Sequence, residues 1–158
     1  MTDARFEDGE EGPLRLTADD ADGLAVISAL VQDAVFPISE MTYVKPRHRF
    51  AVMLNRLRWE DRDAARKAVR PVERVQSLLV FDEVLAVHSA GIDRGQKDTV
   101  LALLSLAFEP GVAGVGRVIL TLAGDGALAL TVEVLDVHLR DVTRPYLAPS
   151  GKVPDHGL

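Results

Sequence analysis

The chain has 158 residues, of which 47% are hydrophobic and 27% charged, and its formal net charge is −6. A chain of this length can form one domain with a single core, and the low aromatic content of 5% predicts an aliphatic core. The absence of cysteine excludes disulfides and thiolate chemistry, and no apolar run approaches the ~20 residues that span a bilayer. Negative net charge also argues against broad nucleic-acid binding.

The N-terminal region divides into an acidic segment and a predicted helix. Residues 1–12 carry five acidic side chains and one arginine, so we expect a flexible acidic tail without the features of a signal peptide, and a cytoplasmic protein. A short strand is possible at 14–16. Thr17 is the predicted N-cap of an amphipathic helix over 18–33, in which apolar residues recur at helical spacing.

From Phe36 the apolar period changes to two, which predicts antiparallel strands. Strands at 36–43 and 49–59 form a predicted hairpin, and the segment 60–74 is a connection with about two helical turns. Residues 75–81 and 84–89 are either one bent strand or two short ones. The apolar segment 99–108 is predicted to lie centrally in a sheet.

The segment 117–135 predicts a β-hairpin whose even-numbered residues form the buried face of both arms. A three-residue loop, 124–126, would set Leu122 opposite Leu128 and place Gly126 in the left-handed conformation. After Val134 the apolar residues become odd-numbered, which predicts a β-bulge, with a helix as the alternative.

These elements predict an α+β, β-rich fold with one N-terminal amphipathic helix and about seven antiparallel strands, forming a partly open barrel or two packed sheets. The predicted organisation is a tail over 1–12, a single domain over 13–143, and an extended Pro/Gly-containing C-terminal tail over 144–158 that contacts the body through Tyr146 and Leu147.

Six short stretches of the chain form a recognisable set. They are LVQDA at 30–34, FAVMLNR at 50–56, WE at 59–60, FDEVLAV at 81–87, GID at 91–93 and PDH at 154–156. Together they resemble a small uncharacterised bacterial family known as domain of unknown function 2948. The resemblance extends from Leu14 to about His156, and it implies a single cytoplasmic domain of bacterial origin without an assigned substrate or catalytic residue.

No motif in the sequence predicts catalysis, a cofactor or a metal. The four histidines lack the spacing of a local metal site, and no serine lies in a glycine-flanked nucleophile elbow. Glycines 111, 114 and 116 precede a strand instead of a helix, so they do not form a phosphate-binding loop. The polar turn 92–98 is interpreted as a solubilising loop. We therefore expect a protein that is not an enzyme.

The segment 56–74 is the stretch with the strongest indication of a binding site, because it carries a local charge of +3 in an acidic protein. Its arginines could bind phosphate or carboxylate bidentately, and its tryptophan could supply a stacking face. The alternative is a solvated connection whose arginines pair with local acids. The candidate contacts for an anion or a partner are Arg56, Arg58, Trp59, Arg62, Arg66, Arg70 and Arg74.

Two functional hypotheses follow. The first is a non-catalytic cytoplasmic binding or scaffold domain, with a protein partner or a homodimer formed through the apolar strand 99–108. The second is a small enzyme or ligand-binding protein that acts on a phosphorylated or carboxylated metabolite through the segment 56–74.

Overall fold

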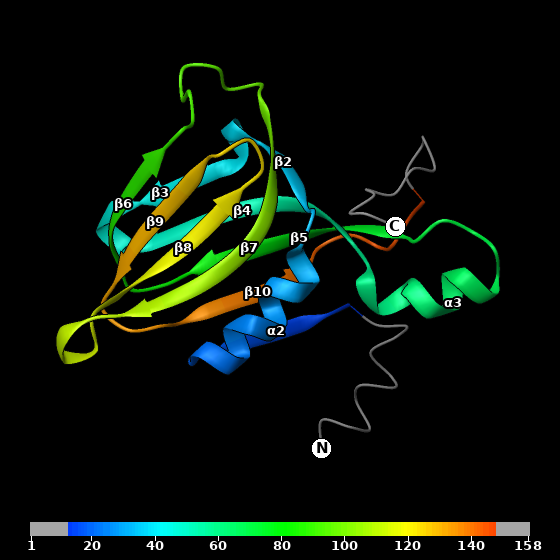
Figure 1. Ribbon diagram of the computed structural model, residues 1–158, viewed down its shortest axis with the longest axis horizontal. Helices are drawn as coiled ribbons and strands as arrows, with labels where there is room; N and C mark the ends of the chain where they lie inside the picture. The colour runs from blue at the N-terminus through cyan, green and yellow to red at the C-terminus, as the bar shows by residue number, and fades with distance from the viewer. Residues whose placement is uncertain (1–12, 148–158) are drawn as a thin grey trace.

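The computed structural model describes residues 13–147, in which ten antiparallel strands form one sheet that does not close (Figure 1). The strand order is β1-β10-β5-β4-β2-β7-β8-β9-β6, and β3 pairs with β4 outside this path. The sheet curves so strongly that its two halves face each other around a common aliphatic core. The strands are β1 (Arg15–Ala18), β2 (Val35–Pro37), β3 (Met41–Val44), β4 (Arg49–Leu57), β5 (Arg74–Phe81), β6 (Val84–Ala90), β7 (Val100–Pro110), β8 (Gly116–Leu122), β9 (Ala127–Val132) and β10 (Val137–Asp141).

The structure confirms the β-rich antiparallel class but contains more elements than the sequence predicts. Two α-helices, α2 (Ala21–Val31) and α3 (Arg62–Lys67), lie in the described range, together with the 3-10 turns η1 (Ile38–Glu40), η2 (Lys45–Arg47), η3 (Trp59–Asp61) and η4 (Val112–Gly114). The strand count rises because η1 divides the predicted strand 36–43, and because β1 and β10 pair with each other at one edge. Neither α-helix among residues 13–147 is long and apolar enough to cross a membrane.

The predicted helix is present, but it begins later than expected. Thr17 belongs to β1, where it lies opposite His138, and the N-cap is Asp20, whose side chain accepts a hydrogen bond from the Gly23 amide. Strand pairing with β10 thus prevails over the local capping preference of threonine. The buried face of α2 packs mainly on β7, and the Ser28 hydroxyl accepts a hydrogen bond from the Leu106 amide of that strand.

The β8–β9 hairpin has the predicted parity but a different register. Leu120, not Leu122, lies opposite Leu128, so the loop is formed by residues 123–125. Gly124 and Asp125 have positive φ, at 80° and 69°, whereas Gly126 does not. The prediction for Gly126 is therefore wrong: a shift of two residues keeps the same face buried, so alternation alone could not choose between the two registers.

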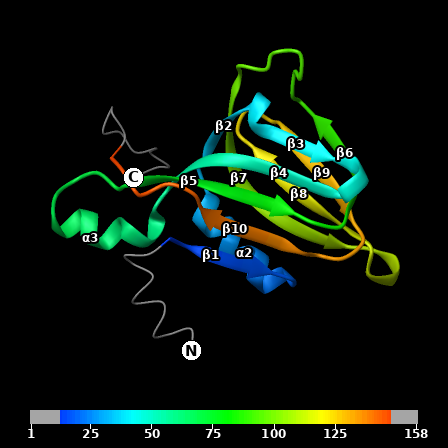
Figure 2. The same ribbon diagram turned by 180° about the vertical axis from the view of Figure 1, so that it is seen from behind.

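The parity change after Val134 marks the end of a strand and not a bulge or a helix. β9 ends at Val132, and the chain crosses to β10, which pairs with β5 and β1 on the other half of the sheet. Residues 82–83 have a similar role, since β5 pairs with β4 whereas β6 pairs with β9. Figure 2 shows that both crossings lie at the same end of the molecule.

The central position predicted for 99–108 is confirmed, because β7 pairs with β2 along one edge and with β8 along the other. At the C-terminus, Tyr146 forms an antiparallel bridge with Arg74 and its hydroxyl oxygen lies 2.8 Å from Asn55 Nδ2, so it contacts the body as expected. Leu147 is exposed. The predicted tail over 1–12 and the part of the C-terminal tail over 148–158 lie outside the described residues.

Candidate functional site

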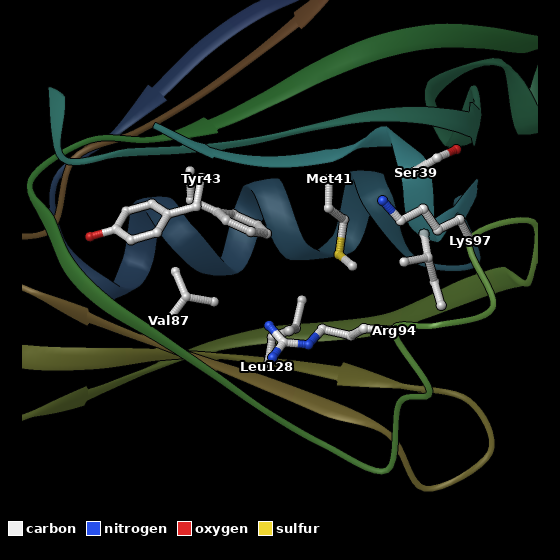
Figure 3. Close-up of a pocket in the computed structure, with 9 residues that line it drawn as sticks. Ser39, Met41, Tyr43, Val87, Arg94, Lys97 and Leu128 are labelled. Atoms are coloured by element: carbon white, nitrogen blue, oxygen red, sulfur yellow. The ribbon is translucent and has the colours of Figure 1, made fainter. Parts of the chain in front are cut away.

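A pocket of about 630 Å³ opens where the curved sheet fails to close (Figure 3). β3 pairs only with β4 and β6 pairs only with β9 in the described part of the chain, so each strand presents an unpaired edge to the other. The nine lining residues come from both edges, from the core-facing side of the sheet and from the β6–β7 connection: Ile38, Ser39, Met41, Tyr43, Phe50, Val87, Arg94, Lys97 and Leu128.

The two strand edges are held together at one end and diverge at the other. The Tyr43 hydroxyl donates to the carbonyl oxygen of Val84 at 2.9 Å, and the Val84 amide donates to the carbonyl oxygen of His48 at 2.7 Å. Beyond these contacts no backbone bond joins β3 to β6 within residues 13–147. The pocket is therefore a consequence of the strand geometry: the seam is closed beside Val84 and open toward Met41.

The wall and floor of the pocket are apolar. Phe50 and Leu128 belong to the buried core, while Met41, Tyr43 and Val87 are half-buried and face the open space. Alternation produces this wall, because Met41 and Tyr43 lie on the same face of β3. An apolar ligand in the pocket would thus contact the core of the protein directly.

Two cationic side chains reach this wall from the β6–β7 connection. Figure 3 shows Lys97 extending toward Met41 and Arg94 extending over Leu128. Neither forms an ion pair within residues 13–147, and no acidic residue lines the pocket. The Ser39 amide donates to the carbonyl oxygen of Lys97 at 3.2 Å, which fixes the loop beside η1. The arrangement is an apolar cavity with positive charge at its mouth.

The segment 56–74 forms a separate lobe, which projects from the curved sheet with α3 at its end (Figure 1). Its first arginine, Arg56, is completely buried and points inward from β4. The guanidinium donates two hydrogen bonds to Glu60, at 2.8 and 3.0 Å, and further bonds to Asp141 and to the Ser77 hydroxyl. Asp141 also accepts hydrogen bonds from the Ser77 hydroxyl and the Leu14 amide.

Several other predicted contacts in the lobe also have partners within the protein. Arg58 pairs with Glu73, and Arg70 pairs bidentately with Asp61 at 2.7 and 2.8 Å. Trp59 donates its indole N–H to the carbonyl oxygen of Gln32, and Arg74 donates to Asn55 Oδ1. Arg62 and Arg66 are exposed on α3. The structure therefore does not bring the seven candidates to one site, and their contact with an anion or a partner stays a prediction.

These ion pairs change the acidity of their members. Burial raises the pKa of Glu60, but the hydrogen bonds and the positive charge of Arg56 outweigh it and hold the pKa below its ordinary value. The hydrogen bonds from Arg70 likewise lower the pKa of Asp61. For Arg56, burial lowers the pKa and the two carboxylates raise it more strongly, so the group stays charged. The network therefore connects the lobe to the curved sheet through ion pairs within the protein.

Sequence reasoning missed Arg94 and Lys97, which it assigned to a solubilising loop. A charged turn of this composition has the same appearance whether it faces solvent or borders a cavity. The contacts that position it, from Ile38 to Thr99 and from Ser39 to Lys97, join segments about 60 residues apart and have no local sequence signal.

A comparison with protein-family models identifies the family of this chain. The family described as "Protein of unknown function (DUF2948)" matches residues 14–156. The chain belongs to the DUF2948 family. No curated protein and no solved structure matches it. The function of this DUF2948 protein must therefore be inferred from the site itself.

Proposed function

We propose that this protein is a non-catalytic binding domain and that its pocket binds a small amphipathic anion, with an apolar body and a carboxylate or phosphate at one end. The observation that supports this proposal is the combination of an apolar wall, formed by Met41, Tyr43 and Val87, with two cations at the mouth that form no ion pair among residues 13–147. Ligand pockets typically have volumes of ~300 to 1,000 Å³ and combine apolar walls with few polar groups.

The distribution of ion pairs favours the pocket over the segment 56–74 as the site of anion binding. An anion that bound Arg56 or Arg70 would have to displace a carboxylate already held by two hydrogen bonds. Arg94 and Lys97 need no such displacement, since neither is paired with a carboxylate in the described part of the chain. Their charges are also not offset by any acid in the pocket lining, so a ligand anion would gain charge-assisted hydrogen bonds there.

The remaining expectations belong to the same proposal. The lack of cysteine and the acidic composition support a cytoplasmic location. A homodimer through the face of 99–108 is proposed as the oligomeric state. An acidic partner at Arg62 and Arg66, which are exposed on α3, is a second candidate interaction.

The test compares decanoate with decanol in NMR of the protein labelled at the methionine methyl groups. Met41 lines the pocket, whereas Met53 lies elsewhere, in a groove with Asn55, and serves as an internal control. We expect both ligands to shift the Met41 signal and to leave the Met53 signal in place. Replacement of both cations, R94Q/K97Q, should lower the affinity for decanoate by about tenfold. Each charge-assisted hydrogen bond contributes ~1.5 to 3 kcal/mol, and solvent screening at the exposed mouth reduces this contribution.

The matched control is R62Q/R66Q, which removes two exposed arginines from α3 and should leave decanoate binding unchanged. Equal decanoate affinity in R94Q/K97Q and the wild type would refute the anion specificity. A Met41 signal that neither ligand moves at saturation of the aqueous phase would refute the pocket as a binding site.

A further inference from the structure

A histidine and two aspartates meet where β5 ends and β10 begins, away from the residues that line the pocket. Asp82 follows β5, while Asp136 and His138 come from the start of β10. The two segments are fixed by the pairing of Val137 with Phe81 and by a hydrogen bond of 2.9 Å from the Asp82 amide to the carbonyl oxygen of Asp136. The three side chains are therefore held by paired backbone on both sides.

One atom of each side chain converges on a common point. His138 Nε2 lies 2.9 Å from Asp136 Oδ1 and 3.5 Å from Asp82 Oδ2, and all three ligand atoms lie within 4.8 Å of one another. Metal–ligand bonds of ~2.0 to 2.2 Å at a tetrahedral angle separate neighbouring ligand atoms by roughly 3.3 Å. The distances from Nε2 to the two carboxylate oxygens, 2.9 and 3.5 Å, lie on either side of this value, so small side-chain shifts would suffice to bring the three atoms around one ion.

The neighbours of this cluster orient the ligands. Thr17 Oγ1 lies 3.3 Å from the other ring nitrogen of His138, Nδ1, so the threonine hydroxyl helps to fix the orientation of the imidazole ring beside the carboxylates. Arg49 donates to Asp82 Oδ1 at 2.7 Å, which turns Oδ2 toward the imidazole. These contacts resemble the second layer of hydrogen bonds that fixes the ligands of metal sites.

We propose that Asp82, Asp136 and His138 bind a divalent transition-metal ion, with Zn²⁺ as the preferred probe. One imidazole and two carboxylates suit zinc and its neighbours better than Ca²⁺, which takes six to eight oxygen ligands. Three protein ligands leave a coordination position open to water, and the side chains of His138 and Asp136 are 40% and 37% exposed. The site is separate from the proposed ligand pocket, with which it shares no residue.

The competing arrangement is a protonated imidazole that forms ion pairs with the two carboxylates and needs no metal. Both arrangements compensate the two negative charges. Metal binding requires the neutral imidazole and the free carboxylates, and it also imposes a coordination geometry that a proton does not. The measurement must therefore report on the metal itself.

The experiment is titration of the full, tag-free chain with Zn²⁺ by calorimetry, together with Co²⁺ absorption spectroscopy as a report on coordination. We expect one equivalent to bind, the Co²⁺ bands of a low-coordinate N/O site to appear, and the melting temperature to rise with free metal. H138Q and D136N should each lower the affinity for Zn²⁺ by more than about tenfold. T17V, which removes a positioning contact, should lower this affinity by about tenfold.

His88, an exposed residue of β6 outside the cluster, supplies the matched control, because H88Q should bind Zn²⁺ like the wild type. Failure of the wild type to bind Zn²⁺ at equimolar concentration would overturn the proposal. So would binding that survives H138Q, or binding that is lost in H156Q and kept in H138Q. Circular dichroism of each variant checks that the fold is retained.

Discussion

Replacement of Arg56 by methionine tests whether the buried ion-pair network braces the fold. Arg56 is 0% exposed, and its main partners, Glu60 and Asp141, are 17% and 4% exposed. Methionine fills a similar volume without charge, so the variant leaves the Asp141 carboxylate buried with only the Ser77 hydroxyl and the Leu14 amide as donors. Removal of one member of a buried ion pair costs about 3 to 5 kcal/mol.

A loss of this size is a large part of the total stability of a domain, which is ~5 to 15 kcal/mol. Urea denaturation at neutral pH measures it, and an unchanged slope with denaturant shows that the native and unfolded states keep their compactness. R62M is the matched control, because Arg62 is exposed in the same lobe and should change the free energy of unfolding by less than about 0.5 kcal/mol. A cost for R56M no larger than that of R62M would refute the reasoning.

The variant E60Q is expected to be less destabilising than R56M, so it provides a second test if R56M does not fold. Its effect on stability should also depend on pH. Arg56 holds the pKa of Glu60 below its ordinary value of 4.5, so this carboxylate stabilises the fold fully above that pH. The contribution is lost as the pH falls through the lower pKa of the folded state. E60Q should therefore be less stable than the wild type at pH 7, by about 1 to 2 kcal/mol. The deficit should shrink below pH 4.5, and a deficit independent of pH would contradict the assigned ion pair.

Two further predictions concern backbone strain and association. Gly91 has φ +71° and an added Cβ would lie 2.7 Å from the carbonyl oxygen of Asp125, so G91A should cost about 1 to 3 kcal/mol in thermal or urea unfolding. G126A, with its nearest contact at 3.4 Å, should cost less; a larger loss in G126A would contradict the observed loop. For association, we expect sedimentation at micromolar concentration to show a homodimer, and a monomer at every loading would exclude it.

The sequence by itself determined the class of fold and the faces of its elements. Alternation from Phe36 onward defined antiparallel strands because side chains of successive strand residues point to opposite faces. The apolar residues of 21–31 defined the buried side of α2, and the continuous apolar run of 99–108 correctly predicted a strand paired on both edges. These features depend on the spacing of apolar residues along the chain, which can be read from the sequence.

The sequence predicted the type of each element better than it predicted where a helix begins or which strand residues lie opposite each other. Thr17 and Asp20 are both acceptable N-caps, and only the pairing of β1 with β10 excluded Thr17. The registers that pair Leu128 with Leu120 or with Leu122 bury the same face, and only the contacts of the loop with its surroundings distinguish them. Where two local solutions have similar energy, tertiary contacts decide.

The candidate sites depended entirely on tertiary structure. The arginines of 56–74 form a cluster in sequence, but folding buries Arg56 between Glu60 of the same segment and Asp141 of β10. Arg94 and Lys97 face an apolar cavity only because β3 and β6 diverge, and His138 meets Asp82 only because β10 lies beside β5. The strand pairings that create these sites join residues distant in sequence, so no local pattern could contain them.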